Sequence, residues 1–258
     1  QGSVMGPLLF NIFINDLLYI NLNSNISSYA DDTQLYSSNI DLNTLKGVIE
    51  SDLHTAHDWF SHNGLLLNAS KSTSMLLSCN HSTLDNLSFT LCNDNISISN
   101  SIKLLGVTID NKLNFNEHIA NIIRKVSNQL QVMKRHKRLI PEKAKIILYK
   151  AYFLPHLNYC SLVWHHCGKR NSDKLEKLNQ RCLRFVFNDY ESNYDKLLKK
   201  INHNSLQNSR YCDLLILIHK AIHNSSPTYI SSIFNERKSK YYLRGERALN
   251  IPSVNTTK

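Results

Sequence analysis

The sequence contains no long hydrophobic run. Its longest stretch of large aliphatic residues, residues 214–218, has five of them, whereas a membrane-spanning helix needs about 20. No stretch resembles a secretory signal, and the six cysteines do not follow the spacing of a disulfide framework. We therefore expect free or buried thiols in a reducing compartment, and no association with a membrane.

Acidic side chains are scarce in the second part of the chain. Residues 111–258 hold 27 lysines and arginines against ten aspartates and glutamates, whereas residues 1–110 hold three against ten. The whole chain has a formal net charge of +10. Such a basic surface is typical of proteins that neutralise nucleic-acid phosphates, and this binding weakens steeply with salt. The alternative is that the basic side chains only solvate exposed helix faces.

Two adjacent aspartates, Asp31 and Asp32, stand between two apolar stretches. Like charges side by side repel, and each carboxylate is costly to desolvate unless a cation compensates it. Mg²⁺ takes one or two protein carboxylates and leaves room for substrate phosphates. The pair therefore predicts half of a metal site for phosphoryl or nucleotidyl transfer. Taken alone, it fits an ordinary turn that carries two aspartates better.

The surrounding motifs strengthen the metal-site interpretation. Residues 1–10 read QGSVMGPLLF, residues 13–17 read FINDL, and residues 29–32 read YADD. In this order and spacing they resemble consecutive motifs of reverse transcriptases, in particular those of the non-LTR retrotransposon branch. The resemblance implies an RNA-directed DNA polymerase that copies an RNA template, extends a DNA primer and uses deoxynucleoside triphosphates.

The same resemblance implies the metal ligands. Two Mg²⁺ ions, for which Mn²⁺ can substitute, would be bound by Asp31 as the main ligand of this motif and Asp32 as its neighbour or second ligand. Tyr29 and Ala30 would place the hairpin tip against the primer end. The family's remaining catalytic aspartate and its fingers would lie N-terminal to Gln1. We therefore expect the isolated chain to be inactive.

Other positions match further motifs of the family. Gln1 and Gly2 match residues that border the template strand and the nascent base pair, where glycine permits close approach of the backbone. Lys71 matches a lysine that donates a proton to the departing pyrophosphate, and a solvated surface lysine is the alternative. Leu105 and Gly106 match the primer grip at the base of the thumb, although Gly106 is also compatible with a simple bulge.

A dense basic segment follows, with nine lysines and arginines within residues 124–150. Apolar residues at helical spacing over residues 119–133 predict a helix with one buried face. Its end would project four basic side chains toward a nucleic-acid duplex: Lys134, Arg135, Lys137 and Arg138. They would contact phosphates without reading sequence. A helix face that only aids solubility is the alternative.

Histidines and cysteines cluster in residues 156–167, which invites a zinc interpretation. Cys160 and Cys167 are separated by six residues, with His165 and His166 adjacent to the second cysteine. This spacing matches none of the usual structural zinc patterns. Because Cys160 lies among apolar residues, we expect it to be buried.

The order of predicted elements indicates an α+β fold. We expect a partial polymerase palm in residues 1–110, formed by an antiparallel sheet with helices on one face. A mostly helical, basic thumb and connection region follows in residues 111–224, and then a loosely ordered basic tail in residues 225–258. The predicted strands include residues 26–30, 34–37, 65–67, 72–78, 87–91, 96–99 and 103–109. The rival from another class is a nucleic-acid-binding remnant of a retroelement without catalysis; a weaker rival is a host-domesticated or intron-maturase relative.

Overall fold

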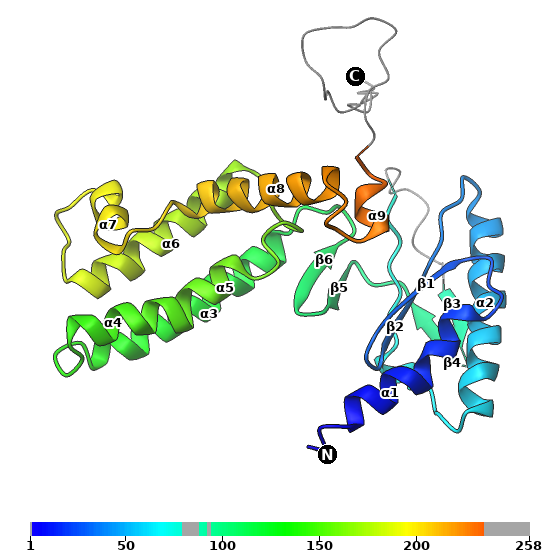
Figure 1. Cartoon of the computed structure of the whole chain (residues 1–258). Helices are drawn as coiled ribbons and strands as arrows, with labels where there is room; N and C mark the ends of the chain where they lie inside the picture. The colour runs from blue at the N-terminus through cyan, green and yellow to red at the C-terminus, as the bar shows by residue number, and fades with distance from the viewer. Residues whose placement is uncertain (1, 79–87, 92–93, 235–258) are drawn as a thin grey trace, which may run out of the picture. The chain divides into compact units, whose positions relative to one another are not determined.

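The chain forms two compact units, Gln1–Lys112 and Leu113–Lys258, in a computed structural model (Figure 1). The structure describes residues 2–78, 88–91 and 94–234. The first unit combines helices with antiparallel hairpins and the second is mostly helical, which confirms the α+β prediction. Over the described ranges, no helix is both long and apolar enough to cross a membrane.

The first unit joins helical segments to paired strands. The helical segments are α1 (Gly6–Ile14), η1 (Asn15–Tyr19), α2 (Leu42–His62) and η2 (Ala69–Lys71). The strands are β1 (Asn25–Tyr29), β2 (Asp32–Tyr36), β3 (Ser88–Leu91), β4 (Asp94–Ser97), β5 (Ser101–Leu104) and β6 (Val107–Asp110). The antiparallel pairing is distributed over three hairpins, β1–β2, β3–β4 and β5–β6, rather than gathered in one sheet of the described residues.

Helix α2 is the main support of the first unit. Asp41 caps its N-terminus, because its carboxylate accepts a hydrogen bond of 2.8 Å from the backbone N–H of Thr44. The helix ends at Asn63, and Gly64 follows with a φ of 71°, a left-handed conformation that glycine adopts without strain. Both ends agree with the predicted limits of this helix. In Figure 1, α2 runs along the hairpins of its unit.

A small apolar core holds the β1–β2 hairpin against the helices. Its buried members are Ile14, Leu17, Ala56 and Phe60, which come from α1, η1 and α2. The hairpin contributes one cross-strand pair to this core, Ile26 and Leu35. Burial of each such aliphatic side chain stabilises the fold by about 1.5–3 kcal/mol. The hairpin is therefore fixed by its middle, and its tip extends beyond the core.

The second unit is built from helices in the order of the chain. They are α3 (Asn116–Arg135), α4 (Glu142–Leu148), the π-helical turn η3 (Tyr149–Phe153), α5 (Leu154–Asn158), α6 (Lys169–Phe187), α7 (Tyr194–Ile201), α8 (Leu206–Ile222) and α9 (Thr228–Ser231). Helix α3 packs against α6, and α6 also contacts α7 and α8 (Figure 1). The π-helical turn lies immediately before Pro155, which lacks the N–H that a regular α-helix would use there.

A polar network ties four helical segments of the second unit together. The Tyr149 hydroxyl donates to Asn179 at 2.9 Å, and the Asn179 amide donates to the Tyr194 hydroxyl at 2.7 Å. Tyr194 in turn donates to the Glu176 carboxylate at 2.6 Å. Glu176 also accepts the backbone N–H of Gln207 at 2.7 Å, in the first turn of α8. Burial, and then the Glu176 carboxylate, raise the pKa of Tyr194.

Two predicted strands of the first unit are wrong. Residues 65–67 form no strand: Leu65 and Leu67 pack on the core while Leu66 is 97% exposed, so the apolar alternation is present without a partner strand. The Asn68 side chain then accepts from the backbone of Lys71 and turns the chain into η2. Residues 72–78 contribute only an isolated bridge at Ser74.

Three further expectations are corrected by the structure. The predicted strand at residues 103–109 is a hairpin, because Leu105 and Gly106 take positive φ values and reverse the chain. Leu8 and Leu9, which we expected in the core, are 53% and 58% exposed on α1. Cys160 is exposed with a φ of 48° rather than buried, because the chain turns there after α5.

Candidate active-site hairpin and nucleic-acid contacts

The paired aspartates lie at the tip of a tight hairpin. Tyr29 is the last residue of β1 and pairs directly with Asp32, the first residue of β2. Ala30 and Asp31 form the two-residue turn between them. Ala30 has a φ of 54°, in the region that glycine or asparagine usually occupies in such turns. A left-handed conformation costs an ordinary residue about 1–2 kcal/mol, so the tip is locally strained.

The register decides which side chains of the hairpin face outward. Cross-strand partners project from the same face. The pair Ile26 and Leu35 faces the core, and two positions further along each strand the pair Tyr29 and Asp32 lies on the opposite face. Tyr29 is 66% exposed, and Asp31 and Asp32 are also exposed. The tip therefore presents two carboxylates and one phenol ring to solvent.

The two carboxylates have no internal partner within the part of the chain that the structure describes. None of its hydrogen bonds or ion pairs involves Asp31 or Asp32. The same ranges contain no group of three or more histidine, cysteine, aspartate or glutamate side chains arranged to hold a metal ion. The pair can therefore supply part of a cation site, and a complete cage would need further ligands.

The hairpin is anchored at its open end by a buried carboxylate that our sequence analysis missed. Asp52 of α2 is 2% exposed and accepts the backbone N–H groups of Ser24 at 2.6 Å and Asn23 at 3.2 Å. Burial disfavours its charged form, but the hydrogen bonds from Ser24 and Asn23 outweigh burial and keep the pKa of Asp52 below its usual range. A possible signal was an aspartate on the apolar face of the helix, at four residues before Ala56.

The remaining predicted residues of the first unit lie on separate segments. Gly2 is exposed with a φ of 97°, and a Cβ there would meet nothing within 4 Å. Gln1 lies outside the described residues. Lys71 ends η2, is exposed, and forms no ion pair within the ranges that the structure describes. Helix η2 packs against β4, and no hydrogen bond links Lys71 to the aspartate hairpin there.

Leu105 and Gly106 form the turn of the β5–β6 hairpin. Leu104 pairs with Val107, and the two turn residues have φ values of 45° and 86°. Positive φ at both central positions is the signature of a type I′ turn, which favours Asn-Gly. Leucine is poorly suited to the first position, yet it is present and 40% exposed. The turn thus displays an aliphatic side chain at the expense of local strain.

The four predicted phosphate contacts lie at and beyond the end of α3. Lys134, Arg135 and Arg138 are exposed, and no ion pair of the described residues involves them. Lys137 differs, because its Nζ donates to the Tyr190 hydroxyl at 3.3 Å and lies 4.9 Å from the centre of that ring. Cations near a helix C-terminus are stabilised by its dipole, so local structure explains part of this cluster.

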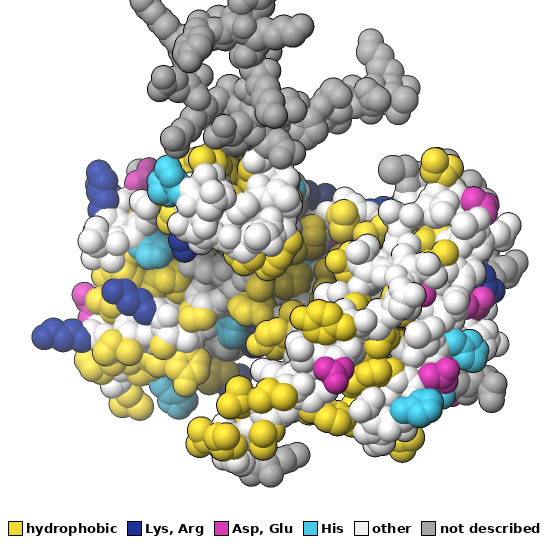
Figure 2. All heavy atoms as spheres, turned by 45° about the vertical axis from the view of Figure 1, so that its right-hand side comes forward, with side chains coloured by type: hydrophobic (Ala, Val, Ile, Leu, Met, Phe, Trp, Pro, Cys, Tyr) yellow, Lys and Arg dark blue, Asp and Glu magenta, His cyan; other side chains and the backbone are white. Residues whose placement is uncertain are grey.

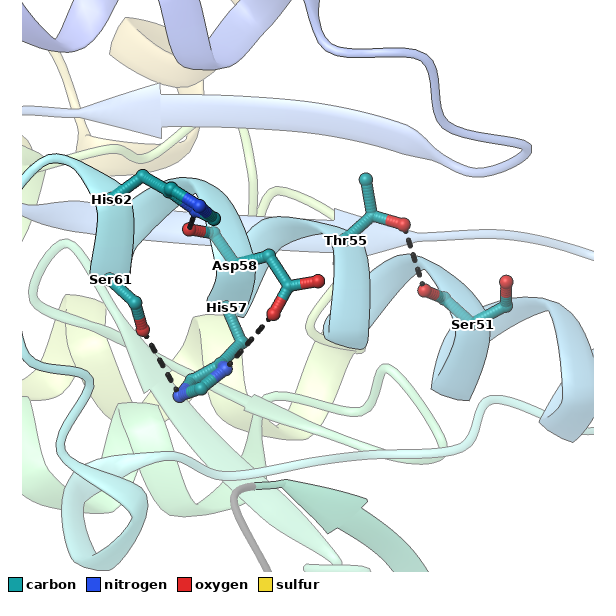
Figure 3. Close-up of polar contacts among 6 residues, drawn as sticks. All are labelled: Ser51, Thr55, His57, Asp58, Ser61 and His62. Carbon is teal, nitrogen blue, oxygen red and sulfur yellow. Dashed lines mark hydrogen bonds and ion pairs between the residues drawn. The ribbon is translucent and has the colours of Figure 1, made fainter.

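Two other polar groupings do not form sites. On α2, Ser61 lies 3.4 Å from the His57 ring, whose other nitrogen lies 3.7 Å from Asp58 (Figure 3). This sequence of residue types resembles a hydrolytic triad, but the three side chains lie on one exposed helix with long contacts, as neighbours one and four positions apart do. His165 and His166 contact each other without a third metal ligand in the described ranges.

Exposed apolar side chains are also present on the first unit. Met5, Leu8, Leu9 and Ile12 are each more than half exposed, although they come from the segment of α1. Figure 2 shows apolar side chains, in yellow, over the visible surface of this unit. The first unit thus combines an acidic hairpin tip with an unusually apolar surface.

A hairpin that ends in paired aspartates and is supported by helices defines a class: the palm of a nucleic-acid polymerase. Residues 1–109 match the family model described as reverse transcriptase (RNA-dependent DNA polymerase). This part of the chain belongs to the reverse transcriptase family, and the predicted resemblance to the non-LTR retrotransposon branch is confirmed.

Curated relatives support the same assignment over a longer stretch. A Pol polyprotein of the type-1 retrotransposable element R1 2 from Nasonia vitripennis is 26% identical over 178 residues, which cover 66% of this chain and 43% of the relative. The RNA-directed DNA polymerase of the mobile element jockey from Drosophila melanogaster is 25% identical over 196 residues, covering 72% and 21%. The chain thus spans less than half the length of these relatives. No solved structure matches it significantly.

Proposed function

We propose that the chain carries part of the active site of an RNA-directed DNA polymerase, with Asp31 and Asp32 as ligands of Mg²⁺. The observation that supports this most is the hairpin tip, where two adjacent exposed carboxylates have no partner among the described residues. Their repulsion calls for a cation, and oxygen ligands suit Mg²⁺ and Mn²⁺. When bound, such ions activate the primer 3′-hydroxyl and offset charge on the incoming phosphates.

The other residues of the two hairpins would position the substrates. Tyr29 shares the outward face with Asp32, so its ring can lie beside the primer end. Ala30 leaves the turn without a bulky side chain, which permits close approach of a nucleic-acid strand. Leu105 and Gly106 would contact the primer through the exposed leucine and the adjacent backbone. The substrates are an RNA template, a DNA primer and deoxynucleoside triphosphates.

Three contributions are assigned by family pattern with less structural support. Gln1 and Gly2 would border the template strand, and Gly2 has the exposed, open backbone that this requires. Lys71 would donate the proton to pyrophosphate, for which its exposed position is suitable. Movement of η2 toward the hairpin, or a bound nucleotide, would have to bring Lys71 to the reacting phosphates.

The basic end of α3 would bind the duplex through its phosphates. Lys134, Arg135 and Arg138 are exposed and lack acidic partners in the described ranges, so they are available for this. Lys137 is held by Tyr190 and would contribute less. Such contacts are not sequence-specific, and each would add about one unit to the slope of log affinity against log salt.

Metal binding is the first test of the proposal. We would titrate the full chain with Mn²⁺ and follow the relaxation of water protons, which reports bound Mn²⁺. The Asp31→Asn/Asp32→Asn variant should lose at least tenfold in affinity, because both ligands become neutral amides. The matched control is Asp16→Asn/Asp58→Asn, which removes the same two charges from exposed positions of the same unit. Equal losses in both double variants would contradict a specific site.

Primer extension is the second test, with Mg²⁺, an RNA template and a DNA primer. Two adjacent carboxylates cannot hold two ions in the geometry that nucleotidyl transfer requires. We therefore expect no extension by the 258 residues alone, and extension when the missing catalytic aspartate is restored by fusing the upstream polymerase segment of a relative to Gln1. Loss of that extension in the Asp31→Ala/Asp32→Ala fusion would complete the assignment.

The alternative function is nucleic-acid binding without catalysis, as a remnant of a retroelement. It is favoured by the basic second unit and by the absence of a third metal ligand in the described residues. This alternative predicts salt-dependent binding of primer and template, no effect of the Asp31 and Asp32 substitutions on that binding, and no extension even in the fusion. The two tests together separate it from the polymerase.

A further inference from the structure

A buried arginine in the second unit lacks a counter-charge. Arg210 of α8 is 2% exposed, and its Nη2 donates to the Ser172 hydroxyl of α6 at 2.7 Å. Its guanidinium carbon lies 5.3 Å from the centre of the Trp164 ring. Its Nε and Nη1 are buried without a hydrogen-bond partner, and no ion pair of the described residues involves Arg210. Arginine remains charged in proteins, so this charge calls for an anion.

The helix that Arg210 contacts begins without a cap. Helix α6 starts at Lys169, after Gly168, and no side chain accepts a hydrogen bond from its first N–H groups. Its first turn holds no acidic residue and instead carries Lys169 and Arg170, both exposed. Positive side chains are unfavourable beside the positive end of a helix dipole. Bound oxyanions, in contrast, are stabilised by free N–H groups at this end.

The space and the polar atoms around this helix start suit such a ligand. Gly168 is exposed with a φ of 78°, and a Cβ placed there would meet nothing within 4 Å. Because the Ser172 hydroxyl accepts from Arg210, its own hydrogen is available for donation. The Nδ1 atom of His165 is a further buried polar atom without a partner. Arg210 also lowers the pKa of His165, after burial and His166, so the two side chains act on each other.

We propose that the first turn of α6, together with Ser172 and Arg210, binds a phosphate oxyanion. The exposed N–H groups and the side chains of Lys169 and Arg170 would contact the anion directly. Arg210 would stabilise it from below, through Ser172 and through the uncompensated charge of its guanidinium. This site is separate from the aspartate hairpin and stands or falls independently of the polymerase assignment. The phosphate comes either from a nucleic-acid backbone or from a small molecule.

The site can be tested on the full chain by thermal unfolding with inorganic phosphate, against chloride at the same ionic strength. Phosphate at tenfold its Kd should raise the unfolding midpoint by about 3 °C. The Lys169→Glu variant places a carboxylate at the helix start, where it competes with the ligand, and it should lose this shift. Because Lys169 is exposed, the variant should fold. The matched control is Lys196→Glu, an equal charge change at an exposed position in the first turn of α7.

A second variant addresses the buried part of the site. Arg210→Gln should weaken phosphate binding at least tenfold in isothermal titration, if the protein folds. Should it not fold, Ser172→Ala, which removes the hydroxyl that links Arg210 to the helix start, should weaken binding severalfold. No phosphate-dependent shift in the parent chain, or equal shifts in Lys169→Glu and Lys196→Glu, would overturn the proposal.

The source of the phosphate is decided by one further arm. We would measure the affinity of a short RNA–DNA hybrid for the same two charge variants. A greater loss for Lys169→Glu than for Lys196→Glu supports the site with a nucleic-acid backbone as ligand. Equal hybrid affinities, together with the loss of the inorganic phosphate response in Lys169→Glu alone, support the site with a small phosphate compound as ligand.

Discussion

Replacement of Asp52 by asparagine is expected to destabilise the first unit, although this residue is absent from every motif of the family. The carboxylate accepts two backbone N–H groups, from Ser24 at 2.6 Å and Asn23 at 3.2 Å, just before β1. It is 2% exposed, so water cannot replace it when it is changed. Asp52 therefore fixes the open end of the hairpin whose tip carries Asp31 and Asp32.

The size of the effect follows from these contacts. A hydrogen bond to a charged group contributes about 1.5–3 kcal/mol, and a buried donor left unsatisfied costs about 1–3 kcal/mol. Asparagine keeps one acceptor oxygen but turns a donor toward the second N–H. We therefore expect Asp52→Asn to lower the free energy of unfolding by about 2–3 kcal/mol, and Asp52→Ala by about 3–5 kcal/mol.

Urea unfolding of the full chain, followed by circular dichroism, would measure both variants. The control is Asp58→Asn on the same helix, where the side chain is exposed and the expected change is below about 0.5 kcal/mol. Because the pKa of Asp52 is lowered by folding, its contribution is complete above the unfolded pKa and is lost as the pH falls through the folded one. The difference between parent and Asp52→Asn should therefore shrink below about pH 4. A change under 0.5 kcal/mol for Asp52→Asn at pH 7 would refute the anchoring argument.

Three further predictions concern other parts of the chain. Leu105→Asn should stabilise the protein to urea by about 0.5–1 kcal/mol, because asparagine tolerates the left-handed conformation, and should weaken primer–template binding. Glu176→Gln should destabilise by about 1.5–3 kcal/mol, since charged hydrogen bonds to Tyr194 and α8 are lost; calorimetry would show this as a lower unfolding midpoint. Arg135→Gln/Arg138→Gln should reduce the salt slope of nucleic-acid binding by about two, and an unchanged slope would exclude them as phosphate contacts.

Local patterns predicted those elements whose signals lie within a few residues. Helix α2 was found from Asp41 and Gly64, because capping depends only on the residues at each end. The aspartate hairpin was found because two short strands flank a favoured turn residue. The strand at residues 65–67 failed because alternation of Leu65 and Leu67 around an exposed Leu66 describes burial, while a strand also needs a partner, which no local pattern supplies.

The candidate site was predictable to the extent that motifs encode it. The motif at residues 29–32 carries the acidic pair, yet the contacts that hold it come from residues far apart in the chain, such as Asp52 and Ser24. Likewise, nothing in the sequence around Ser172 indicates that Arg210 lies against it, since the two are joined only by the packing of α6 and α8. Chemistry that depends on long-range packing requires the structure.

The two tight turns of the first unit depart from the best turn residues at the positions that the family motifs assign to nucleic acid. Ala30 has a φ of 54° and Leu105 a φ of 45°, where glycine or asparagine would relieve strain. Strain of this kind persists where the surrounding structure over-determines it, and it is concentrated at binding and catalytic sites. In the first hairpin that support is identifiable: Ile26 and Leu35 hold its middle and Asp52 holds its end. An exposed turn with no function would have lost its strain at little cost, so the retained alanine and leucine favour a function for both tips.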